Sequence, residues 1–158
     1  MKILILGHGR HGKDTVAHFI AGLTGLEFTS SSIFACEKVV YPHMEYNSVR
    51  ECYRDRHNHR QLWYNLIKDY NTPDKPKLCK ELLNEYDIYV GMRDNKEYEA
   101  SKHLFDVIFW VDASGRKPDD QTMKIEYNED DHILINNNDT LTYLFHDVEY
   151  ALNLINHL

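Results

Sequence analysis

The sequence contains little cysteine and no long apolar run. Its three cysteines, Cys36, Cys52 and Cys79, are odd in number and widely separated, which is typical of reduced thiols in a cytosol rather than of a disulfide framework or a metal site. No apolar segment approaches the length of a membrane span. The N-terminus does not have the pattern of a signal peptide, because Lys2 is followed directly by an expected strand and a glycine-rich turn. We therefore expect a cytoplasmic protein that has no membrane partner.

Metal-ligating clusters are scarce as well. The ten histidines are scattered, and only His57 and His59 form a close pair, so the spacing does not predict a histidine metal centre. A chain of 158 residues is long enough for one domain with a substantial core. Its composition is that of an ordinary soluble globular protein.

The net charge of −7 is unevenly distributed along the chain. Residues 1–80 carry twelve Lys and Arg against eight Asp and Glu, whereas residues 81–158 carry six against seventeen. The acidic half is typical of a solvated surface. The basic half indicates a polyanionic partner on that side of the molecule.

A glycine-rich turn near the start of the chain is the most informative motif. The run Ile3-Leu4-Ile5-Leu6 is followed by Gly-His-Gly-Arg-His-Gly-Lys-Asp-Thr at residues 7–15 and then by an amphipathic helix. This is the spacing of a phosphate-binding P-loop, in which backbone amides and a helix N-terminus surround phosphate oxygens and a lysine reaches the β- and γ-phosphates. The residues expected to bind ATP are Gly7, Gly9, Arg10, His11, Gly12, Lys13, Asp14 and Thr15.

One position departs from the usual loop. Asp14 stands where a Ser or Thr normally offers a hydroxyl to magnesium. A carboxylate at this position is able to hold Mg²⁺ directly or through water, which leaves Thr15 to bond a phosphate oxygen. Asp14 is therefore the predicted metal ligand.

The rest of the chain alternates between strand and helix patterns. Short apolar runs at 26–29, 87–92, 105–111 and 133–135 predict four further strands, with helices between them. Strands that alternate with helices after a P-loop predict a single α/β domain over 1–158, a P-loop NTPase fold with a doubly wound five-stranded parallel sheet. Residues 46–86 are helical in pattern and form an insertion between strands 2 and 3, which we expect over the mouth of the P-loop.

Several side chains are expected to bind the acceptor substrate. Ser31 and Ser32 follow the second strand and Arg93 follows the third, and ligands bind at the carboxyl ends of parallel strands; the serines are equally suited to capping a helix. The helical insertion supplies Arg56 and Arg60, four residues apart, which repel unless an anion lies between them. It also supplies Trp63 and Tyr64, which are suited to stacking on a base, although a Trp at this spacing also suits a core.

The polar segment at about 112–121 follows the fourth strand. It has the composition of a short lid, in which Arg116 would supply positive charge to the phosphoryl group in transfer. An ordinary surface loop accounts for the same composition. Lys13, Arg93 and Arg116 are the predicted catalytic cations.

The sequence resembles the P-loop nucleoside monophosphate kinase superfamily. The loop ending in Gly-Lys-Asp-Thr, the strand that leads to Arg93 and the segment 135–141 are similar to phage deoxynucleoside monophosphate kinases. A likeness over nearly the whole chain is to phage 5-hydroxymethyluracil DNA kinases, in residues 7–15, in Ser-Ser-Ser at 30–32, in Asp-Arg-x-x-His-Arg at 55–60 and in a Tyr-Asn-Thr-Pro turn. This resemblance implies ATP- and Mg²⁺-dependent phosphorylation of the hydroxymethyl group of modified uracil in phage DNA, a thymidine hypermodification that evades restriction.

Three functions remain open from the sequence. A deoxynucleoside monophosphate kinase acting on free nucleotides needs no base, because its acceptor is already an oxyanion. A DNA hydroxymethyl kinase gains from a general base, for which Asp14, Asp55 and His59 are candidates and Asp55 is preferred. A nucleotide-binding regulatory protein without transfer activity is favoured by Asp14 and disfavoured by the three predicted cations.

Overall fold

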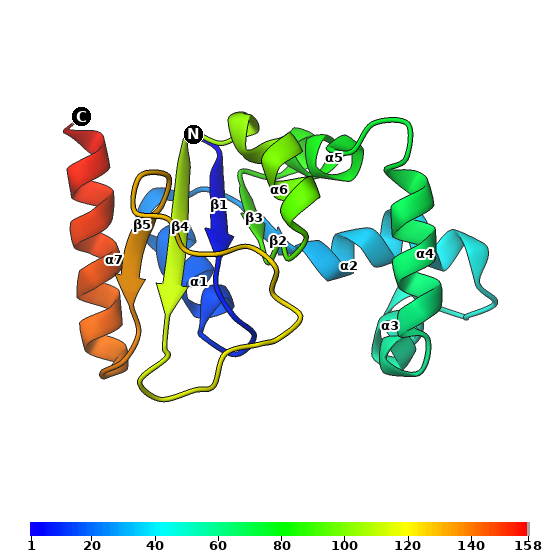
Figure 1. Ribbon diagram of the computed structural model, residues 1–158, viewed down its shortest axis with the longest axis horizontal. Coiled ribbons are helices and arrows are strands. Elements are labelled where there is room, and N and C mark those ends of the chain that lie inside the picture. The colour runs from blue at the N-terminus through cyan, green and yellow to red at the C-terminus, as the bar shows by residue number, and fades with distance from the viewer. Residues whose placement is uncertain (158) are drawn as a thin grey trace.

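The computed structural model describes residues 1–157, which form an α/β fold with helices on both faces of one sheet (Figure 1). Five parallel strands lie in the order β2-β3-β1-β4-β5. Their bounds are β1 (Ile3–Leu6), β2 (Phe28–Ser30), β3 (Ile88–Val90), β4 (Val107–Asp112) and β5 (Ile133–Asn136). The predicted five-stranded parallel sheet is confirmed. No helix within these residues is long and apolar enough to cross a membrane.

Strand β1 lies at the centre of the sheet. Ile3 is opposite both Ile88 of β3 and Val107 of β4, and all four residues of β1 are fully buried. A strand with neighbours on both edges and helices on both faces has to be apolar throughout, which explains the run Ile-Leu-Ile-Leu. Such a strand delivers the loop that follows it to a fixed position at the carboxyl end of the sheet.

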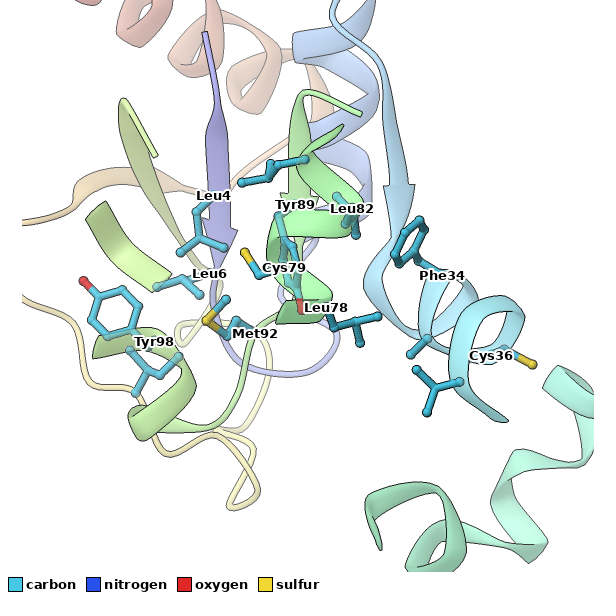
Figure 2. Packing of buried hydrophobic residues seen from close by; sticks show 14 of the residues in the cluster. Leu4, Leu6, Phe34, Cys36, Leu78, Cys79, Leu82, Tyr89, Met92 and Tyr98 are labelled. Carbon is cyan, nitrogen blue, oxygen red and sulfur yellow. The ribbon is translucent and has the colours of Figure 1, made fainter. Parts of the chain in front are cut away.

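The two faces of the sheet bury separate clusters. On one face, the alternate residues Ile3 and Ile5 pack against α1 (Lys13–Thr24) and α7 (Leu141–Asn156). On the other face, Leu4 and Leu6 pack with residues of α5 (Lys77–Glu85) and α6 (Asn95–Ser101), as Figure 2 shows. This alternation is the two-residue period of a strand.

Helical structure begins directly after β2, ahead of the insertion predicted at 46–86. Helix α2 (Ser31–Ala35) continues into the π-helix η1 (Cys36–Val40) and the 3-10 helix η2 (Tyr41–His43). Pro42 occupies the first turn of η2, where its missing N–H costs nothing. Residues 48–70, expected as one helical stretch, form α3 (Val49–Arg54), η3 (Asp55–Asn58) and α4 (Arg60–Tyr70). Ser48 caps α3, since its hydroxyl accepts the Glu51 amide at 3.2 Å.

The insertion lies beside the sheet. In Figure 1, α3 and α4 lie beyond the β2 edge, on the side away from β4 and β5. Both helices pack on η1 through the buried side chains of Cys52 and Trp63. The expectation that these helices cover the mouth of the P-loop is therefore wrong for this structure.

Candidate phosphate-binding site

The loop between β1 and α1 has the backbone shape that its glycines suggest. Gly7, Arg10 and Gly12 have positive φ angles of 145°, 66° and 99°. A Cβ atom at Gly7 would lie 2.5 Å from the Val111 carbonyl oxygen, and one at Gly12 would collide with the Asn137 side-chain amide. Glycine is therefore required at both positions by conformation and by space. The loop is closed against β4 and against the turn after β5.

Lys13 is the first residue of α1 and its ammonium group bends back over the loop. It donates hydrogen bonds to the carbonyl oxygens of Gly7 and His8, each at 2.9 Å. Burial, together with the neighbouring charge of Arg93, lowers the pKa of Lys13 to about 8. An anion in this place would relieve the repulsion between the two cations. The structure thus brings together two of the predicted catalytic residues.

One carboxylate lies among the predicted phosphate-binding groups. Asp120 Oδ2 accepts a hydrogen bond from Arg93 Nη1 at 2.8 Å, and the Gly9 amide also bonds this carboxylate. Although burial acts in the opposite direction, hydrogen bonds from Thr122 and the charge of Arg93 hold the pKa of Asp120 below its usual value. The Asp120 charge in turn favours the protonated form of Lys13. Three groups predicted to hold phosphate therefore converge on one internal anion.

Asp120 was absent from the predicted site residues. It lies within the segment predicted as a lid, and its only sequence signal is the acidic pair Asp119-Asp120. A carboxylate and a phosphate are both anions, so an acidic residue beside a P-loop is not expected from sequence to belong to a phosphate site. The chain position of Arg93, 27 residues away, gives no indication of their contact.

Two histidines attach this segment to the P-loop. The buried His11 accepts the Ala113 amide at Nδ1 (3.0 Å) and lies 3.1 Å from the Pro118 carbonyl through Nε2. These partners require the proton on Nε2. His8 Nδ1 accepts the Asp120 amide at 3.0 Å. The predicted nucleotide contact of the His11 side chain is thus corrected, because this side chain is committed to the segment after β4.

A pocket of ≈ 340 Å³ adjoins the loop on its α7 side. Its lining residues are Arg10, Gly12, Thr15, Arg116, Asn137, Asp139, Leu141 and Leu144. The volume is within the range of small-molecule sites, and leucines with a polar rim suit a flat heterocyclic base. The asparagine-rich turn after β5 therefore forms one wall of a pocket.

Arg116 lies in this pocket rather than beside Lys13. Its Nε donates to the Asn137 carbonyl oxygen at 2.8 Å. This position differs from the predicted one, at the phosphoryl group in transfer. The reason is that residues 113–117 turn back toward β5, where Gly115 also bonds Asn138 at 2.7 Å.

Ser31 and Lys13 both lie close to Gly91, the residue after β3. A Cβ atom placed on Gly91 would be 3.6 Å from Ser31 Oγ and 3.8 Å from Lys13 Cε, so both side chains adjoin this glycine. Ser32 Oγ lies 2.8 Å from Ser30 Oγ and 3.4 Å from the Tyr53 hydroxyl. The structure thus places Ser31 at the loop and turns Ser32 toward the insertion.

The aromatic and basic residues of the insertion contact one another. Arg56 stacks on the Tyr53 ring at 4.0 Å from its centroid and donates to the Tyr53 carbonyl at 3.0 Å. Arg60 lies 2.9 Å from His57 Nδ1. Trp63 belongs to the buried cluster, so its ring packs in the core and is not presented to a base. Tyr64, by contrast, is 60% exposed.

Asp55 stabilises a turn. It accepts hydrogen bonds from the Tyr46 hydroxyl and the Asn58 amide, each at 2.5 Å, and lies 3.1 Å from His59 Nε2. The bonds from Tyr46 and Asn58 lower the pKa of Asp55, which weakens it as a base. Within residues 1–157 no hydrogen bond or ion pair joins it to the P-loop. The predicted general base thus has a structural role in η3.

The loop residues fit a magnesium ion that arrives with a nucleotide. In residues 1–157 no group of three or more His, Cys, Asp or Glu side chains forms a metal site of its own. Mg²⁺ in phosphoryl-transfer sites needs only one or two carboxylates, because phosphate oxygens and water complete its shell. Asp14 is exposed in the first turn of α1, beside Lys13. It remains the predicted ligand.

Together, the parallel sheet and the loop define an α/β fold with a P-loop after its central strand. The chain is similar to the structure of a gluconokinase from Sinorhizobium meliloti 1021, with a TM-score of 0.54, 14% identity and coverage of 99% of this chain and 96% of that one. It is also similar to a sugar kinase from Janibacter sp., with a TM-score of 0.49, 14% identity and coverage of 98% and 94%. No protein-family model and no curated protein matches the sequence. The likeness to the gluconokinase structure shows that the two chains share a fold.

Proposed function

We propose that this protein is a kinase that transfers the γ-phosphoryl group of ATP. The convergence of Lys13, Arg93 and the Gly9 amide on the Asp120 carboxylate carries this proposal, because these groups are arranged for anionic oxygen. In the proposed complex, phosphates replace that carboxylate and the base enters the pocket beside Arg116. Mg²⁺, held by Asp14, would neutralise charge on the phosphates.

For the acceptor, we infer the hydroxymethyl group of 5-hydroxymethyluracil in phage DNA. The resemblance described above supports this choice. Arg50 and Arg54 of α3 add further support, because both are exposed and neither forms a side-chain ion pair within the described residues, so DNA phosphates could contact them. Tyr64 is the exposed aromatic side chain that would stack on a base.

The alternative acceptor is a free deoxynucleoside monophosphate. Arg93 favours it, since a guanidinium at the carboxyl end of β3 would hold an acceptor phosphate as well as a transferring one. A nucleotide-binding regulatory protein is the remaining alternative, and the exchange of the usual hydroxyl for Asp14 is the feature that favours it.

The test is incubation with labelled ATP and Mg²⁺, with 5-hydroxymethyluracil-containing DNA or a panel of deoxynucleoside monophosphates. Label on the DNA, and none on matched thymine DNA, is the expected result. Label on monophosphates alone would overturn the DNA acceptor, and ATP hydrolysis that no acceptor changes would favour the regulatory alternative.

Two variants accompany this assay. Lys13→Ala should abolish transfer to any acceptor, because it removes the cation that contacts the transferring group. Lys75→Ala is the matched control, since Lys75 is an exposed lysine of the turn between α4 and α5 and its loss should leave transfer unchanged.

A further inference from the structure

A second pocket, of ≈ 530 Å³, lies between α6 and the segment that joins β4 to β5, and we call it the α6 pocket. It borders the phosphate site through Arg93. Asn95, which lines the pocket, follows Arg93 by two residues, and the amide of Lys124, another lining residue, donates to the Arg93 carbonyl oxygen at 3.0 Å. In Figure 1, the yellow segment between β4 and β5 runs from the carboxyl ends of the strands toward α6. The α6 pocket therefore adjoins an arginine that the proposed function places at the phosphates.

Tyr98 brings an unused hydrogen-bond donor to this pocket. His132 Nδ1 accepts the Asn128 amide at 3.1 Å, and burial lowers the pKa of His132, so the neutral ring carries its proton on Nε2. That proton is donated to the Tyr98 hydroxyl oxygen at 2.8 Å. The Tyr98 proton itself has no acceptor within residues 1–157, although the residue is only 3% exposed. Phenylalanine would fill the same space without a polar group that needs a partner, so the hydroxyl group requires an explanation.

An aromatic ring suited to stacking lines the same pocket. Tyr127 is 43% exposed, and its ring centroid lies 6.0 Å from that of Trp110 and 5.9 Å from that of His132. The buried His132 in turn stacks on the buried Trp110, with 14° between the ring planes. Two buried rings thus position Tyr127 while part of its side chain stays accessible. A fixed, accessible aromatic ring is typical of a site that stacks on a flat ligand.

The charges around the α6 pocket largely compensate one another. Glu99, Glu126 and Asp131 contribute carboxylates, and Lys124 contributes an ammonium group. Lys102 lies 3.4 Å from Glu99 and 3.3 Å from Asp131, and it offsets part of the negative charge. Neither an anionic nor a strongly cationic ligand is therefore favoured. The pocket suits an uncharged, flat molecule that accepts a hydrogen bond from Tyr98 and donates one to a carboxylate.

We propose that the α6 pocket binds the pyrimidine base of the acceptor substrate. The inference rests on the proposed kinase function and names where that function holds its acceptor. A uracil ring is flat and uncharged, and its pairing edge has carbonyl oxygens that accept hydrogen bonds and an N–H group that donates one. The volume of the pocket is within the range of small-molecule sites.

A base in duplex DNA cannot enter the pocket while it is stacked and paired. The acceptor nucleotide therefore has to leave the helix, as in other enzymes that carry out chemistry on a base. Its edge would then bond Tyr98 and its ring would stack on Tyr127. Tyr64, in the insertion, would contact a base that stays outside the pocket.

Two variants test this proposal by kinetics. Tyr98→Phe removes only the hydroxyl group, so KM for DNA that contains 5-hydroxymethyluracil should rise about tenfold, with KM for ATP unchanged. Tyr127→Ala removes the stacking ring and should raise the same KM at least about fivefold. Tyr150→Ala is the matched control, because Tyr150 is an exposed tyrosine of α7 that lines neither pocket.

A fluorescent duplex measures the extrusion of the base without catalysis. The fluorescence of 2-aminopurine placed beside the 5-hydroxymethyluracil rises when its neighbour leaves the helix, because stacking quenches this fluorescence. Wild-type protein should raise the fluorescence of the modified duplex in the absence of ATP. Tyr98→Phe and Tyr127→Ala should each need at least about fivefold more protein for the same rise.

The outcomes separate the α6 pocket from the kinase function. Wild-type protein that transfers no label to any acceptor defeats the kinase proposal. Wild-type protein that transfers label, while both variants keep its KM for the acceptor, overturns the pocket alone. Label on monophosphates alone, with KM raised by both variants, overturns the DNA acceptor and supports the pocket as the site of the acceptor base. Tyr127→Ala keeps the test decisive where Tyr98→Phe does not fold, because Tyr127 is partly exposed.

Discussion

Replacing Asp120 with asparagine tests whether this carboxylate occupies the place of a nucleotide phosphate. The amide has nearly the same shape, so it keeps an oxygen for Arg93 and Thr122 while it removes the negative charge. A hydrogen bond to a charged group contributes about 1.5–3 kcal/mol. Because Arg93 is 52% exposed and Asp120 20% exposed, solvent screening brings the expected difference just below this range, to about 1.4 kcal/mol. ATP would no longer displace a charged ligand, so its dissociation constant should fall about tenfold.

Calorimetric titration with ATP at about 0.15 M salt would measure this change. Asp119→Asn is the matched control, because it removes the same charge from the neighbouring residue, which is 67% exposed and lies 3.8 Å from His8 Nε2. Asp120→Asn should therefore bind ATP more tightly than Asp119→Asn does. Equal affinities would refute the idea that the Asp120 carboxylate occupies the place of a nucleotide phosphate. Weaker binding by Asp120→Asn would show that the carboxylate helps to hold the nucleotide.

Three further predictions follow from the loop and the insertion. Because the pKa of Lys13 is about 8 in the free protein, ATP affinity should be constant below pH 8 and should fall above it as the ammonium loses its proton; constant affinity from pH 7 to 9 would contradict this. Gly12→Ala should lower the free energy of unfolding by about 1–2 kcal/mol, since φ is 99° there, and urea denaturation would measure it, with Gly22→Ala, in open space within α1, as the control. The double variant Arg54→Ala, Tyr64→Ala should raise KM for modified DNA at least about fivefold, from lost stacking of about 1–3 kcal/mol, and leave KM for a monophosphate unchanged; equal increases would argue against DNA.

The sheet and the loop could be predicted because their signals are local. Residues 3–6 are apolar without interruption, which only a strand buried on both faces requires, and the loop spacing fixes which residues meet a phosphate. Lys13 and Arg93 met because both follow central strands, and the carboxyl ends of parallel strands share one edge. These inferences needed no knowledge of long-range packing.

The remaining site residues depend on contacts that no local pattern indicates. Asp120 meets Arg93 and Gly9 only because two histidines hold the segment after β4 against the loop. Asp55 and Trp63 were predicted at the acceptor, whereas hydrogen bonds from Tyr46 and Asn58 hold Asp55 and the packing of α4 on η1 buries Trp63.

The sheet order also determines when the phosphate site can form during synthesis. Strand β1 is made first, but its partners begin only at Ile88 and Val107, so the central strand stays unpaired while most of the chain is translated. The loop after it is shaped by still later residues, since Gly7 abuts Val111 and Gly12 abuts Asn137. A ribosome-bound chain that lacks β5 therefore has the complete motif in its sequence without the cradle, and it exposes an apolar strand that a chaperone would recognise.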